Sequence, residues 1–201
     1  MPRPTERADT KYTYADYLTW PDDERWEIID GVAYAMSPAP TYRHQAISRN
    51  LGFLIHAFLK DQSCEMLLAP LDVRLPSPIH LVDNPKEQYT VVQPDLIVVC
   101  DKEKLNDRGC YGAPDLLVEI LSPSTTHKDL KIKYELYQRH GVKEYWIVYP
   151  EEGVIEIHIF DQAMGKYAPA LEYKNQDKIE CRLLSGLTIP LSEVFDSREQ
   201  A

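Results

Sequence analysis

The stretch that most constrains the fold of this chain is an aliphatic run with one carboxylate inside it. Residues 116–121 read LLVEIL and are flanked by proline, glycine and serine, which is typical of a short strand. A strand so rich in aliphatic side chains is expected in a sheet that is covered on both faces. Burying Glu119 there without a partner would be costly, so we expect it to be paired with a cation, protonated or bound to a metal ion.

Length and composition predict a single domain. With 201 residues and 44% hydrophobic content, the chain can bury a sizeable core. We expect a flexible N-terminal segment over residues 1–12, one domain over 13–196 and a C-terminal tail over 197–201. No apolar run approaches the roughly 20 residues of a membrane span, and the first residues lack the apolar core of a signal peptide. The expected location is cytoplasmic, and the four cysteines, none in a CxxC pair, are expected as free thiols rather than a zinc site or disulfides.

The formal net charge of −10 limits the classes of function. It argues against a protein whose main role is to coat nucleic acid, because such binding depends on lysine and arginine. It leaves a nuclease open, since a local basic strip or a divalent metal ion can supply positive charge where it is needed.

The first third of the chain predicts a short helix, a hairpin and a long helix. Thr13 can cap a helix over residues 14–20. Asp30-Gly31 between two apolar segments is a strong hairpin signal, and it places Glu27 on the first strand. Apolar residues at helical spacing over residues 42–60 predict a long amphipathic helix.

The rest of the chain is expected to form mostly strands, with one further helix. A capping-box spacing at residues 126–129 precedes a helical stripe of Leu130, Tyr134 and Tyr137, which Gly141 ends. The expected strands cover residues 66–75, 79–82, 89–100 with an interruption at Pro94, 114–121, 144–149, 153–160, 166–173 and 178–184, and residues 101–112 are expected as a polar connection.

Two of these strands place a second carboxylate beside Glu119. If residues 89–100 and 114–121 form an antiparallel hairpin, Asp95 directly faces Glu119. Directly opposed residues have Cβ atoms about 4.5–5.5 Å apart, and two like charges at that distance are destabilising unless something positive lies between them. Mg²⁺ or Mn²⁺ is the economical candidate, because hard ions bind carboxylate oxygens. A structural salt bridge is the alternative for this pair.

The helix that follows the strand can bring a lysine to these carboxylates. Lys133 lies beside the apolar stripe, and a helix running on from the strand can pack back over the strand's C-terminal end. An ammonium there could stabilise an anionic transition state or orient an attacking water. A solvated helix lysine is the alternative, and Lys128 and Lys131 compete for the same role.

Several linked motifs run along residues 13–160. They are WEIIDG at 26–31, HQAI at 44–47, PDLIVV at 94–99, APDLLVEILSPS at 113–124, Asp129 with Lys133 and Tyr137, and GVKEYW at 141–146 with Pro150. Together they resemble the Uma2 family of restriction endonuclease relatives, which is placed in the PD-(D/E)xK nuclease superfamily. The resemblance implies an α+β (α/β-like) fold with a restriction-endonuclease-like mixed β-sheet flanked by helices, and a metal-dependent phosphodiesterase site.

Carried over onto this sequence, the resemblance assigns the main site residues. Asp95 and Glu119 become metal ligands, together with the backbone carbonyl of Ile120. The superfamily motif has lysine where this chain has Leu121, so Lys133 on the following helix becomes its substitute.

Two further residues are candidates for auxiliary roles. Glu27 resembles the early acidic residue that can add to the metal shell, and its alternative is an exposed glutamate at a strand end. His44, near the start of its helix, could reach the metal ion or the leaving group, and its alternative is an ordinary helix histidine.

The function that the resemblance implies is a Mg²⁺- or Mn²⁺-dependent endonuclease that hydrolyses phosphodiester bonds in DNA. One alternative is a catalytically weakened nuclease-fold module that binds nucleic acid or protein, which the missing strand lysine and the acidic composition favour. Another is a metal-dependent hydrolase of a different phosphate ester, since two carboxylates and a lysine do not name their substrate. An exposed face of the terminal strands could support a homodimer.

Overall fold

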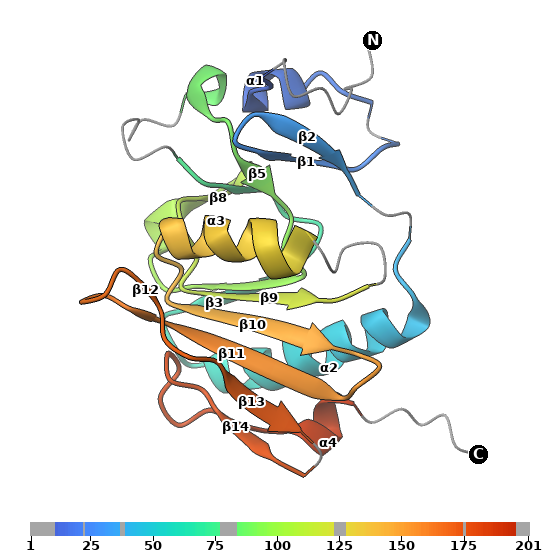
Figure 1. Cartoon of the computed structure of the whole chain (residues 1–201), viewed down its shortest axis with the longest axis vertical. Helices are drawn as coiled ribbons and strands as arrows, with labels where there is room; N and C mark the ends of the chain where they lie inside the picture. The colour runs from blue at the N-terminus through green and yellow to red at the C-terminus, as the bar shows by residue number, and fades with distance from the viewer. Residues whose placement is uncertain are drawn as a thin grey trace.

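The computed structural model of the chain describes residues 11–21, 23–36, 39–76, 84–122, 128–174 and 176–195. These residues form two mixed sheets with helices packed against them, so the predicted α+β (α/β-like) fold is confirmed. In Figure 1 the six-stranded sheet lies in the upper part, and helix α3 (Tyr134–Arg139) lies in the middle. The seven-stranded sheet lies below, with helix α2 (Tyr42–Leu59) behind it. No helix within the described ranges is long and apolar enough to cross a membrane.

The seven-stranded sheet contains the aliphatic strand with Glu119. Its order is β12-β11-β10-β9-β6-β3, and β13 pairs with β11. The bounds are β3 (Glu65–Leu68), β6 (Leu96–Val99), β9 (Leu116–Ile120), β10 (Glu144–Tyr149), β11 (Val154–Asp161), β12 (Lys166–Tyr167) and β13 (Leu171–Lys174). Strands β9 and β10 run parallel, because the connection between them crosses over through the π-helical segment η3 (Lys128–Lys133) and α3.

Strand β9 is buried on both faces, as its aliphatic sequence predicts. Leu116, Val118 and Ile120 belong to a core that also holds the apolar face of α2. Leu117 belongs to a second core, which holds α3 and strands of the six-stranded sheet. Because side chains alternate along a strand, Glu119 points to the side of α3 and of the six-stranded sheet.

The six-stranded sheet has the order β2-β1-β5-β4-β8-β7. Its bounds are β1 (Trp26–Ile29), β2 (Val32–Ala35), β4 (Val73–Arg74), β5 (Val91–Val92), β7 (Leu105–Asn106) and β8 (Gly109–Tyr111). Helix α1 (Tyr14–Tyr17) precedes β1, and the short 3-10 helices η1 (Pro85–Glu87) and η2 (Lys102–Lys104) precede β5 and β7. A separate pair, β14 (Lys178–Glu180) and β15 (Thr188–Pro190), packs with α4 (Leu191–Val194) onto the core that holds α2.

Several local predictions are confirmed. Thr13 caps α1 in a capping box with Asp16, although the helix ends at Tyr17. The β1–β2 hairpin turns through Asp30 and Gly31, both with positive φ, at 53° and 88°. Helix α2 has almost the predicted bounds.

Two expected strands are divided between the two sheets. Residues 66–75 form β3 and β4 on either side of Pro70, and residues 89–100 form β5 and β6 on either side of Pro94. Proline has no backbone N–H to donate to a ladder, so the pairing stops and the chain crosses to the other sheet. The expected polar connection over residues 101–112 contains η2 and the β7–β8 hairpin, which form one edge of the six-stranded sheet.

The helix after β9 also differs from its prediction. Leu130 is exposed rather than part of a buried stripe, because η3 is π-helical and its residues do not repeat at 3.6 per turn. The capping box at 126–129 and the strand at 79–82 fall partly or wholly outside the described residues. So do residues 1–10 and 196–201, and the predicted domain bounds stay a prediction.

The prediction of four free thiols is wrong for two of the cysteines. Cys64 and Cys100 flank β3 and β6, where the strand register brings them opposite each other, and they form a disulfide. Cys110 and Cys181 are free and buried.

Candidate active site

The predicted pairing of Asp95 with Glu119 is confirmed by the register of β6 and β9. Leu96 pairs with Val118, so the residues one step further on each strand, Asp95 and Glu119, lie opposite each other. The Asp95 Oδ2 atom also accepts a hydrogen bond from the backbone N–H of Ile120, with a donor–acceptor distance of 2.8 Å. This hydrogen bond fixes the Asp95 carboxylate at the C-terminal end of β9.

Lys133 is buried between two glutamates that come from different sheets. Its Nζ atom lies 2.8 Å from Glu119 Oε1 and 2.8 Å from Glu27 Oε1. Lys133 is only 2% exposed, which rules out a solvated helix lysine. Lys131 is exposed, and the side chain of Lys128 lies outside the described part of the chain. The structure therefore brings Lys133 to the carboxylates.

Tyr137 lies one helical turn beyond Lys133 and contacts the same carboxylate. Its hydroxyl donates a hydrogen bond to Glu119 Oε1 at 2.7 Å, and the residue is fully buried. Burial, together with the nearby charges of Glu119 and Glu27, raises the pKa of Tyr137 well above its ordinary value. The hydroxyl therefore keeps its proton and acts as a donor. The sequence places Tyr137 in an apolar stripe, and its i, i+4 spacing from Lys133 is the signal for its contact with Glu119.

Gln93 holds Glu27 from the other side, and no sequence motif singles this glutamine out. Its backbone N–H donates to Glu27 Oε1 at 3.0 Å. The Gln93 side chain is itself fixed, because its Oε1 accepts from Arg25 Nη2 at 2.7 Å and its Nε2 donates to Asp72 Oδ1 at 2.9 Å. This network ties β1 to the segment between β5 and β6, and it restrains the Glu27 carboxylate.

His44 reaches the same cluster from the beginning of α2. Thr41 caps this helix by accepting the His44 backbone N–H at 3.2 Å. The His44 Nε2 atom then lies 3.3 Å from Asp95 Oδ2. The five predicted side chains thus form two contact groups that the strand register places next to each other. Lys133 contacts Glu27 and Glu119, His44 contacts Asp95, and Asp95 lies opposite Glu119.

Acidic side chains gather at this place in the fold. Glu27 and Glu119 flank one ammonium, and Asp95 lies opposite Glu119 in the strand register with His44 beside it. Carboxylate oxygens are the ligands that Mg²⁺ and Mn²⁺ prefer, so the chemistry of the donor set fits such an ion. No group of three His, Cys, Asp or Glu side chains within the described ranges is arranged to hold an ion by itself. An ion here would also need water or backbone carbonyl ligands.

Asp115, directly before β9, has a structural environment. Its carboxylate accepts hydrogen bonds from the Cys100 backbone N–H at 2.8 Å and from Lys143 Nζ at 2.6 Å. Burial raises the pKa of Asp115, but the hydrogen bonds from Lys143 and Cys100 outweigh it and hold the pKa below its ordinary value. These contacts fix the beginning of β9, away from the cluster around Lys133.

Comparisons with known proteins identify the family and the fold of this chain. The profile of the Uma2 family, described as "Putative restriction endonuclease", matches residues 14–192. The "Uncharacterized protein slr1290" of Synechocystis sp. (strain ATCC 27184 / PCC 6803 / Kazusa) is 26% identical over 187 residues, which are 92% of each chain. The crystal structure of a "putative nuclease belonging to DUF820" from Anabaena variabilis ATCC 29413 is similar with a TM-score of 0.69 at 18% identity. That similarity covers 92% of this chain and 97% of the other, and it shows a shared fold.

Proposed function

This chain belongs to the Uma2 family, and from that premise we propose that it is a Mg²⁺- or Mn²⁺-dependent endonuclease that hydrolyses phosphodiester bonds in DNA. The observation that carries the proposal is the convergence of acidic side chains at the buried Lys133. Its ammonium lies 2.8 Å from both Glu27 and Glu119, and Asp95 lies opposite Glu119 in the strand register. A divalent cation bound by these carboxylates would allow a negatively charged phosphodiester to approach.

We assign metal binding to Asp95, Glu119 and the Ile120 backbone carbonyl, with Glu27 as an auxiliary ligand. When bound, Mg²⁺ or Mn²⁺ would lower the pKa of a coordinated water and neutralise charge on the scissile phosphate. The surrounding residues keep the carboxylates in place. The Ile120 N–H holds one oxygen of Asp95, and Tyr137 holds one oxygen of Glu119. Such supporting hydrogen bonds orient metal ligands and limit their motion.

Lys133 would act on the substrate side of the same site. An ammonium at this position would orient the attacking water or offset the negative charge that develops on the phosphate. Its contacts with Glu27 and Glu119 hold it in place before substrate binds. His44 lies against Asp95 and would contact the metal shell or the leaving group.

Cleavage of supercoiled plasmid DNA by the purified chain tests the proposal. We expect cleavage to need Mn²⁺ or Mg²⁺, and Asp95→Asn and Glu119→Gln each to lower the rate by about 100-fold or more, because each removes a proposed ligand. Glu135→Gln is a matched control on the exposed face of α3 and should cleave like the wild type. Circular dichroism and thermal melting would show that each variant is folded.

Two outcomes would favour other functions. If the wild type binds DNA but cleaves neither DNA nor RNA with any divalent ion, it is a nuclease-fold binding module. If it hydrolyses another phosphate ester but leaves DNA intact, it is a metal-dependent hydrolase with a different substrate. A wild-type chain that binds no divalent ion would contradict the metal-dependent mechanism itself.

A further inference from the structure

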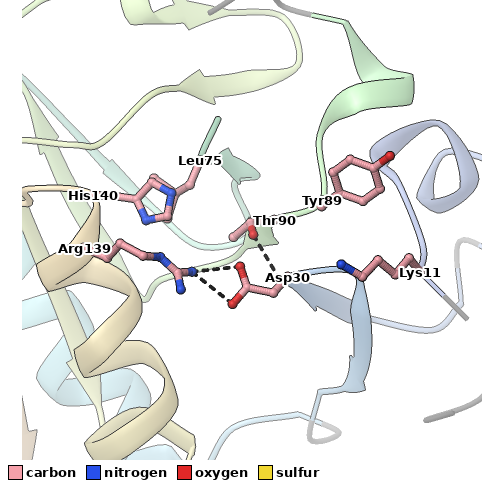
Figure 2. A pocket seen from close by; sticks show the side chains of 7 residues that line it. All are labelled: Lys11, Asp30, Leu75, Tyr89, Thr90, Arg139 and His140. Atoms are coloured by element: carbon pink, nitrogen blue, oxygen red, sulfur yellow. Dashed lines mark hydrogen bonds and ion pairs between the residues drawn. The ribbon is translucent and has the colours of Figure 1, made fainter. Parts of the chain in front are cut away.

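A separate cavity lies at the turn of the β1–β2 hairpin, beside the end of α3. Its volume is about 300 Å³, and its charged lining residues are Lys11, Asp30 and Arg139. Figure 2 shows Arg139 and Lys11 on opposite sides of Asp30, with His140 and Tyr89 at the two flanks. We propose that this pocket binds a small ligand with a phosphate group and a planar ring, of the nucleoside monophosphate type.

The lining offers cationic donors that the protein does not use up. Arg139 pairs with Asp30 through Nη2 alone, at 2.8 Å and 3.0 Å from the two carboxylate oxygens. Its Nη1 and Nε groups therefore remain as donors. Lys11 forms no ion pair with any residue that the structure describes, although it lines the same cavity. Arginine and lysine together are well suited to a phosphate, which accepts several charge-assisted hydrogen bonds.

Asp30 holds the Arg139 side chain at the cavity and leaves its guanidinium able to bind a ligand. The hairpin turn fixes Asp30 at a φ of 53°, and the backbone N–H of Asp30 donates to Thr90 Oγ1 at 3.1 Å. Both partners of the Asp30–Arg139 ion pair are about half exposed, so the pair is weak and can share its guanidinium with a ligand. The Thr90 hydroxyl lines the cavity as well and can donate its own proton to an oxyanion.

His140 lines the cavity with a polar ring that carries no charge near neutral pH. Its Nδ1 atom lies 2.9 Å from the Leu136 carbonyl oxygen, which can only accept, so Nδ1 carries a proton. Burial lowers the pKa of His140, and the ring is therefore neutral near pH 7. The positive charge of the pocket comes from Lys11 and Arg139, and Asp30 offsets one of them.

The apolar side of the pocket can contact the planar ring of the ligand. Tyr89 is 37% exposed and lines the cavity, and the buried Leu75 lines it as well. An aromatic side chain beside a cationic site is suited to stack on a nucleobase whose phosphate is held by the cations. The volume is at the small end for ligand pockets, which favours a mononucleotide over a longer strand.

This pocket is separate from the candidate active site. Glu27 lies within β1 and Asp30 in the turn directly after it, three residues further on, which is a span of up to about 10 Å. Ile29 between them is packed in the core with Leu136. The ligand site therefore does not depend on nuclease activity, and either proposal can fail without the other.

Calorimetric titration in EDTA tests the pocket while leaving the metal site without ions. The probes are deoxyadenosine 5′-monophosphate, deoxyadenosine and inorganic phosphate. We expect the monophosphate to bind more tightly than either fragment, and Lys11→Gln with Arg139→Gln to weaken it by about tenfold or more, because two cationic donors are lost. Arg49→Gln, on the exposed side of α2, is the matched control and should bind like the wild type.

Amide chemical shifts would locate the bound ligand, with changes expected at Gly31, Thr90 and His140. Binding that survives in the Lys11→Gln and Arg139→Gln variant would overturn the proposal. So would shifts confined to the region of Glu119, or deoxyadenosine that binds as tightly as its monophosphate. Thermal melting of the double variant would show that it is folded, which is expected because both side chains lie at the surface of the pocket.

Discussion

Replacing Lys133 with methionine removes the ammonium that lies 2.8 Å from both Glu27 and Glu119. Methionine keeps much of the side-chain length and volume, so the change acts mainly on charge. Removing one partner of a buried ion pair costs about 3–5 kcal/mol. Since 1 kcal/mol lowers the melting temperature of a domain of this size by about 2–4 °C, we expect a loss of roughly 6–20 °C in metal-free buffer.

Mn²⁺ should reverse part of this loss. A ligand that binds only the folded state adds about 2.7 kcal/mol of stability at a hundredfold excess over its Kd. The stabilisation by Mn²⁺ should be larger for Lys133→Met than for the wild type, because the variant lacks the positive charge of the ammonium beside the proposed ligands. In contrast, cleavage of DNA should fall even where Mn²⁺ restores stability, since the ammonium is still missing.

Differential scanning calorimetry in EDTA measures the loss of melting temperature in Lys133→Met, and the same measurement in Mn²⁺ gives the stabilisation by the metal ion. Lys131→Met is the matched control, because Lys131 is exposed on the same helical segment, and it should change the free energy of unfolding by no more than about 0.5 kcal/mol. If Lys133→Met is too unstable to purify, adding Glu27→Gln removes one of the two facing charges and should recover stability. A Lys133→Met chain that melts like the Lys131→Met control would refute the charge argument.

Three further changes follow from the described contacts. Tyr137→Phe removes the hydroxyl donor to Glu119 and should lower the plasmid cleavage rate by about 2- to 10-fold, whereas an unchanged rate would give the hydroxyl a purely structural role. Because the pKa of Asp115 is lowered in the folded chain, its carboxylate stabilises the fold above the unfolded value of about 3.9, and this contribution is lost as the pH falls through the folded pKa. Asp115→Asn should therefore cost about 1–3 kcal/mol in urea unfolding at pH 7, with the difference from wild type shrinking below about pH 4. Without reductant, the unfolded chain should show two reactive thiols rather than four, and Cys64→Ser with Cys100→Ser should cost about 4 kcal/mol for a loop of this length.

The pairing of Asp95 with Glu119 could be predicted because the two strands are neighbours in sequence and in space. The chain returns antiparallel to β6 after η2 and the β7–β8 hairpin, and the register of β6 with β9 is the one that the sequence predicts. The sequence could not show which sheet each half of a strand joins. Pro70 and Pro94 divide two apolar runs between the sheets, and an alternating pattern looks the same in either one.

Long-range contacts account for the other differences. Gln93 holds Glu27 through its backbone N–H, a contact that carries no signature in side-chain type. The disulfide joins Cys64 to Cys100 because β3 pairs with β6, and cysteine spacing alone does not reveal such a pairing. Tyr137 has the periodicity of a core residue, and its spacing from Lys133 indicates a polar partner only once Lys133 is known to contact Glu119.

The helical position of the lysine has a consequence that a strand lysine would not have. A lysine in place of Leu121 would share the face of Glu119, about 6.6 Å further along the same strand, and would belong to one sheet only. Lys133 instead approaches from between the sheets and contacts Glu119 of β9 and Glu27 of β1 together. The charge balance of the site therefore depends on how the two sheets are packed. A cation that draws Glu27 or Glu119 toward itself would change the contact between the sheets, so metal binding and stability of the fold should be coupled through Lys133.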